Sequence, residues 1–149
     1  MNIEKIFIAS YERTIGEGVG ITERGQVFFR RFYENFLASS ERVREKFAST
    51  DMEQQQRVLQ KGVYQLISFY LTKSDSKFLR DIALSHDQRH LHIESDLYDL
   101  WLESLVATVA EMDPNYDSDL ELAWRIVMTP GILYMKHYYA LPGPEDKAE

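Results

Sequence analysis

Apolar residues along the chain recur at spacings of three and four positions, with polar residues filling the intervals. This period is typical of amphipathic helices, whereas a half-buried strand alternates apolar and polar residues with period two. No valine- or threonine-rich run with that alternation occurs. The pattern therefore predicts six or seven helices and no strand, over about residues 3–14, 22–37, 40–47, 51–70, 75–85, 96–113 and 118–139.

Polar residues that can cap helices stand at the expected helix starts. Serine, threonine and aspartate side chains accept hydrogen bonds from the free N–H groups of a first helical turn. Thr50 is followed three positions later by Glu53, which is a capping-box start, and Asp51 is the alternative cap. The other candidate caps are pairs of neighbours: Ser39 or Ser40, Ser74 or Asp75, Ser95 or Asp96, and Asp117 or Ser118.

Glycine and proline gather near the two ends of the chain. Residues 26–113 contain no proline and only one glycine, Gly62, which is typical of helical sequence. Pro130 falls inside the last predicted helix and is expected to bend it, because proline lacks a backbone donor and crowds the preceding turn. We expect an all-α fold in one domain over residues 1–140, followed by a polar tail over residues 141–149.

Composition narrows the class of protein. The chain has 149 residues, of which 44% are hydrophobic and 28% charged, as in ordinary globular domains. The net charge of −7 argues against partners such as nucleic acid or an anionic membrane, which attract basic proteins. The absence of cysteine excludes disulfides and thiol nucleophiles. With no signal peptide or membrane-length apolar run in view, we expect a cytoplasmic protein.

Three of the four histidines, His86, His90 and His92, lie close together in the sequence. His86 and His90 are spaced i, i+4, which places two imidazoles on one helical face and suits zinc. A zinc protease, however, needs glutamate directly after the first histidine, where this chain has Asp87. Two other interpretations are a pH-sensitive surface cluster and imidazoles that cap a helix C-terminus.

A fourth interpretation is that His86 is a haem ligand. It shares a helical face with Leu79 and Ile82, and a helix break follows it. A single histidine on an apolar face is how globins hold iron. The polar residue needed on the other side is available as Gln55, one turn before Leu59 on an earlier helix. The spacing alone leaves all four interpretations open.

Several segments resemble bacterial globins, including the haem domain of flavohaemoglobins and the sensor globins. Tyr33 precedes Phe47 by 14 residues, as a distal tyrosine precedes the phenylalanine that packs on haem in that family. The segment ending at His86 resembles the proximal-histidine segment. The aromatic residues after it also resemble the family, at positions Tyr98, Trp101 and Trp124. The resemblance covers roughly residues 22–139.

The resemblance implies a globin-like fold of six to eight helices around a pocket for haem b. It implies that His86 is the axial ligand of a five-coordinate iron that binds oxygen, nitric oxide or carbon monoxide. Tyr33 and Gln55 would form the polar distal pair beside Leu59, with Gln56 as the alternative to Gln55. The implied cofactor contacts are Phe47, Tyr33, Gln55, Leu59, Ile82, His90, Ile93 and Tyr98, with His90 near a propionate and Arg57 or Lys61 as further candidates there.

Two departures from flavohaemoglobins limit what the resemblance implies. Tyr98 follows His86 by twelve residues, two more than in that family, so a contact between the two side chains is not expected. No acidic residue stands near Met135 and Lys136, where flavohaemoglobins place a glutamate that polarises the proximal histidine. A carboxylate relay is therefore not expected.

Several functions remain open from the sequence. The chain could store or sense a gas, or it could act as a nitric oxide dioxygenase with a separate reductase. A globin-shaped signalling or interaction module without haem is the main alternative outside the haem proteins. The expected partner is a diatomic gas, and the protein is expected to be a monomer or a homodimer.

Overall fold

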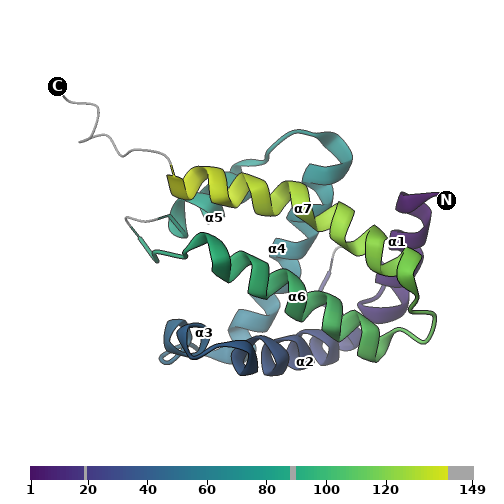
Figure 1. The fold of residues 1–149 in the computed structure, drawn as a ribbon, viewed down its shortest axis with the longest axis horizontal. Coiled ribbons are helices and arrows are strands. Elements are labelled where there is room, and N and C mark those ends of the chain that lie inside the picture. The colour runs from purple at the N-terminus through teal and green to yellow at the C-terminus, as the bar shows by residue number, and fades with distance from the viewer. Residues whose placement is uncertain (19, 88–89, 141–149) are drawn as a thin grey trace.

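The computed structural model describes residues 1–18, 20–87 and 90–140. Within these ranges the chain forms seven α-helices and no strand, which confirms the predicted all-α fold (Figure 1). The helices are α1 (Ile3–Thr14), α2 (Glu23–Ser39), α3 (Glu41–Lys46), α4 (Met52–Thr72), α5 (Lys77–Ser85), α6 (Ser95–Met112) and α7 (Ser118–Ala140). The predicted tail, residues 141–149, lies outside the described residues.

Side-chain caps fix the starts of most helices. Ser40 caps α3, Asp51 caps α4 and Asp117 accepts a bond from the Leu120 amide at the start of α7, all within the predicted pairs. At α6 the predicted Ser95 is the first helical residue, and no side chain makes a cap hydrogen bond there.

The predicted cap of α5 was wrong. Ser76 fills this position, because its hydroxyl accepts a 3.0 Å bond from the Leu79 amide. The two residues expected to do so have other roles. Asp75 accepts a 2.7 Å bond from the Tyr134 hydroxyl of α7, and Ser74 lies in the turn after α4. α5 therefore begins after a Ser76 cap, while Asp75 contacts α7.

The long helices α6 and α7 lie one above the other in Figure 1, with α2 and α3 along the lower edge and α1 beside the start of α7. Trp124 of α7 is fully buried where these elements meet. Its ring packs edge-on against Phe7 of α1 and stacks with Phe28 of α2, at centroid distances of 4.7 and 6.3 Å. Pro130 lies inside α7, which continues to residue 140.

Two glycines let α4 approach its neighbours closely. A Cβ atom on Gly25 of α2 would lie 2.5 Å from the Gln60 side chain, and one on Gly131 of α7 would lie 2.4 Å from the Leu66 side chain. Both partners belong to α4. The glycines therefore set the depth at which α4 lies between α2 and α7.

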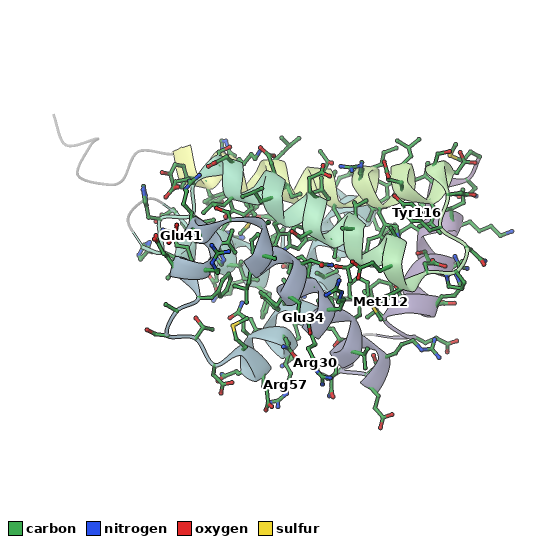
Figure 2. All side chains as sticks on the ribbon, turned by 60° about the horizontal axis from the view of Figure 1, so that its bottom comes forward. Arg30, Glu34, Glu41, Arg57, Met112 and Tyr116 are labelled. Atoms are coloured by element: carbon green, nitrogen blue, oxygen red, sulfur yellow. The ribbon has the colours of Figure 1, made fainter. Side chains whose placement is uncertain are left out.

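None of the described helices is long and apolar enough to cross a membrane. Figure 2 shows charged side chains on the outside of α2 and α4, among them Arg30, Glu34 and Arg57, all of which are exposed. The helices therefore pair an apolar inner face with a charged outer face, as the sequence pattern predicts.

Candidate cofactor-binding cleft

A cleft enclosing about 860 Å³ of empty space, part of it open to solvent, lies among α2 to α7. Most of its wall is apolar, formed by Phe36, Val43, Phe47, Leu59, Leu66, Leu79, Ile82, Ile93, Leu97, Trp101, Ile132 and Met135. Five polar or charged side chains join them: Tyr33, Lys46, Gln55, His86 and Tyr98.

His86 follows directly after α5 and is held by the end of that helix. Its Nδ1 lies 2.8 Å from the Ile82 carbonyl oxygen, one turn earlier. A carbonyl only accepts hydrogen bonds, so Nδ1 carries the proton and Nε2 keeps its lone pair. Burial lowers the pKa of His86 below its ordinary value, although the bond to Ile82 opposes this shift. The neutral imidazole is the form that binds a metal.

Tyr33 of α2 and Gln55 of α4 form a polar pair in the cleft. The Gln55 amide Nε2 donates a 3.1 Å hydrogen bond to the Tyr33 hydroxyl oxygen. The Tyr33 O–H proton is then available for another acceptor. Burial raises the pKa of Tyr33, partly offset by the Gln55 bond, so the hydroxyl stays protonated. The α-helical period places Gln55 and Leu59 on the same face of α4.

Phe47 is positioned by the end of the short helix α3. Its backbone N–H bonds to the carbonyls of Arg44 and Glu45, which closes the helix. Its ring meets those of Tyr33 and Phe36 edge-on, at centroid distances of 5.5 and 6.0 Å. These contacts fix the ring at the wall of the cleft.

Tyr98 of α6 brings an unpaired hydroxyl into the cleft. The residue is 8% exposed, and its hydroxyl is the only buried side-chain N or O atom among the described residues that lacks a hydrogen-bond partner. Burial raises its pKa. Leaving such a group unpaired costs about 1–3 kcal/mol. A polar atom on a bound molecule would satisfy it.

The structure brings together eight of the nine candidate residues. Only His90 is outside the cleft lining: it is exposed, and its Nδ1 lies 2.7 Å from the Asp87 carboxylate. The structure also places Gln55 in the lining and leaves Gln56 outside it. The described residues contain no group of three or more side chains that could hold a metal ion by themselves.

Sequence reasoning missed three informative residues in the lining, Lys46, Gly62 and Met135. Gly62 carried a signal, since it is the only glycine in a long helical stretch. A Cβ on Gly62 would meet nothing within 4 Å, so the open space begins at the α4 backbone. Lys46 carried no such signal, because its place depends on how α3 packs. The resemblance pointed to the region of Met135, but only as a position without the family's glutamate.

The residues present fit haem. The donor set contains one neutral imidazole with a free Nε2, and the walls suit a flat apolar molecule. The orphaned Tyr98 hydroxyl and the open space at Gly62 are features that a bound group would fill. Haem is large, flat and apolar, with polar groups on its edge, and meets these requirements.

Comparisons with known proteins place the chain in a family. No protein-family profile and no curated protein matches it. A solved crystal structure does: a Pseudomonas aeruginosa PAO1 protein described as structurally highly homologous to a human haemoglobin. The two share 40% sequence identity with a TM-score of 0.82, over 94% of this chain and 100% of the other.

The fold and the cleft define a protein of the globin class, which confirms the predicted globin-like fold. At 40% identity over the whole of its relative, the chain belongs to the same globin-like family as this Pseudomonas protein.

Proposed function

We propose that the chain is a haem-binding globin that holds haem b through His86 and binds a diatomic gas, with oxygen as the favoured ligand. The observation that carries the proposal is the state of His86: its Nδ1 is committed to the Ile82 carbonyl, and its ring lines an apolar cleft with a Tyr33–Gln55 pair. Haem held there supplies an iron centre with a coordination position for the gas.

The chain's own residues define which gas is favoured. The Tyr33 hydroxyl has a free proton to donate, and the Gln55 amide has a second N–H besides the one it gives to Tyr33. A hydrogen bond to a charged oxygen contributes about 1.5–3 kcal/mol. Oxygen, which takes on negative charge when it binds, gains more from these donors than the less polar carbon monoxide. The apolar walls keep water away.

The interaction module without haem is less well supported. That function favours a pocket filled by the protein's own bulky side chains, whereas this cleft has open space beside Gly62, where a Cβ atom would meet nothing within 4 Å. Nitric oxide dioxygenation with a separate reductase uses the same cleft. Turnover of nitric oxide by the purified protein with an added reductase separates that activity from gas binding.

The test is an absorption spectrum of protein produced with haem supply. We expect a red protein with a Soret band that shifts on adding oxygen or carbon monoxide to the reduced form. His86→Ala should abolish haem retention, because it removes the only imidazole in the described lining. His90→Ala is the matched control and should retain haem. A His86→Ala protein with an unchanged spectrum contradicts the assignment of His86.

A further inference from the structure

Lys46 is a lining residue of the cleft that carries a positive charge. It is the last residue of α3, directly before Phe47, and its side chain is 30% exposed. Within the part of the chain that the structure describes, it is the only lysine or arginine that lines the cleft. The charge is only partly exposed and gains from a partner, since an unpaired charge is costly to remove from water.

The partners of Lys46 hold the ammonium in place and include one carboxylate, that of Glu94, in a long ion pair. Its Nζ donates to two neutral acceptors, the backbone carbonyls of Leu91 and His92, at 3.3 and 2.9 Å. The nearest carboxylate oxygen belongs to Glu94, at 3.8 Å, which is beyond hydrogen-bond distance. That carboxylate is bound more closely by Arg42. An ammonium has three protons, and the two carbonyls account for two of them.

Other cations near this end of the molecule are less suitable anchors. Arg42 is paired with both Glu94 and Asp96 and does not line the cleft. Arg57 and Lys61, the candidates from the sequence, are exposed on α4 and are also outside the lining. Position and incomplete charge pairing therefore coincide at Lys46.

We propose that Lys46 binds a carboxylate on the edge of the flat molecule in the cleft, and so makes the site selective for an acidic ligand over its neutral ester. This inference rests on the proposed function, in which the acidic group is a haem propionate. The two carbonyl bonds orient the ammonium before the ligand arrives. The carboxylate supplies the missing counter-charge.

The experiment compares two probes. Haem carries free carboxylates, and in haem dimethyl ester both carboxylates are blocked. Dissociation of each is followed as transfer to excess apomyoglobin, for the wild type, Lys46→Met, Lys46→Arg and the matched control Lys61→Met. Lys46→Met should release haem roughly 3- to 10-fold faster than the wild type, because it loses a charged hydrogen bond that partial exposure to solvent weakens. The Lys46→Met protein should release the ester at the wild-type rate.

The other two variants complete the test. Lys46→Arg should restore haem dissociation to within about twofold of the wild type, because the charge is retained. Lys61→Met should match the wild type with both probes. Thermal unfolding of each apoprotein, followed by circular dichroism, checks that the variants are folded.

Each contrary result has a definite meaning. If Lys46→Met releases haem and the ester faster by the same factor, the proposal is overturned, because Lys46 then acts only by holding the backbone at Leu91 and His92. Unchanged haem release in Lys46→Met overturns it as well, while haem uptake by the wild type leaves the proposed function standing. A wild-type protein that takes up neither probe overturns both.

Discussion

The hydroxyl of Tyr98 illustrates how a single residue can serve binding at the expense of stability. It lies in a cleft without a partner, in a position that phenylalanine would fill without leaving a polar atom unpaired. A polar group in such a position is stabilised only when something else occupies the cleft. The effects of removing it on the apoprotein and on the complex should therefore have opposite signs.

Tyr98→Phe should raise the free energy of unfolding of the apoprotein by about 1 kcal/mol, because no buried donor is left unsatisfied. In a chain of this size this raises the midpoint of thermal unfolding by roughly 2–4 °C. The same variant should lose haem faster than the wild type. Circular dichroism of the apoprotein and haem transfer from the complex measure the two effects. A less stable apoprotein would show that the hydroxyl has a partner within the protein.

Tyr33 and Gln55 should control how long oxygen stays bound. Tyr33→Phe is expected to raise the oxygen dissociation rate about 10- to 100-fold, because it removes a hydrogen bond of about 1.5–3 kcal/mol to a charged oxygen. Gln55→Leu should act in the same direction. Gln56→Leu is the control, since Gln56 is outside the cleft lining. Stopped-flow measurements check the rates, and an unchanged rate in Tyr33→Phe would remove Tyr33 from the ligand site.

At the scale of helices, the depth of α4 decides the shape of the cleft. α4 carries Gln55, Leu59, Gly62 and Leu66 along one wall, and close approach at Gly131 fixes its distance from α7. Substitution of alanine for glycine should therefore change the stability of the apoprotein in opposite directions at Gly62 and at Gly131.

Gly62→Ala should stabilise the apoprotein by about 0.5–1 kcal/mol, because alanine costs less backbone entropy in a helix and its Cβ meets no atom within 4 Å. Gly131→Ala should destabilise it by about 1–2 kcal/mol, since its Cβ would lie 2.4 Å from Leu66. Urea unfolding measures both values. A stabilising Gly131→Ala would mean that Leu66 moves aside at little cost.

At the scale of the whole molecule, a polar cluster joins α1 to the end of α6 and to α7. The Ser10 hydroxyl donates to Asp113 at 2.6 Å and accepts from the Trp124 indole at 2.9 Å. Arg13 forms a two-bond pair with the same carboxylate, at 2.9 and 3.0 Å. α1 is thereby fastened to its neighbours by residues that do not line the cleft.

This cluster should make stability depend on pH in acid. Burial alone would raise the pKa of Asp113, but the bonds from Arg13, Ser10 and the Asn115 amide outweigh it and hold the pKa below its ordinary value. The stability that this carboxylate contributes is therefore present above the unfolded pKa of about 4 and is lost as pH falls through the lower folded value.

Asp113→Asn should lower the free energy of unfolding at pH 6 by about 2 kcal/mol, because the charged hydrogen bonds to Arg13 are lost. The loss of stability between pH 6 and pH 3 should be smaller in this variant than in the wild type. Thermal unfolding at the two pH values measures the difference. An equal pH dependence in both proteins would show that other carboxylates cause the acid effect.

The sequence by itself determined the helices, because their apolar period and capping residues act within a few turns of chain. The same local signals identified His86 as a candidate ligand, and its bond to Ile82 is likewise local. The choice of Tyr33, Gln55 and Phe47 came from the resemblance to globins, whose spacing encodes a tertiary arrangement that periodicity alone does not show.

Only the tertiary structure decided which side chains face the cleft. It separated Gln55 from Gln56, put His90 outside the lining and brought in Lys46. It also showed that Ser76 caps α5, whereas Asp75 bonds to Tyr134 of α7. These outcomes depend on how deeply helices cross and on partners distant in the chain. Such distances arise from packing, which a pattern of neighbouring residues does not contain.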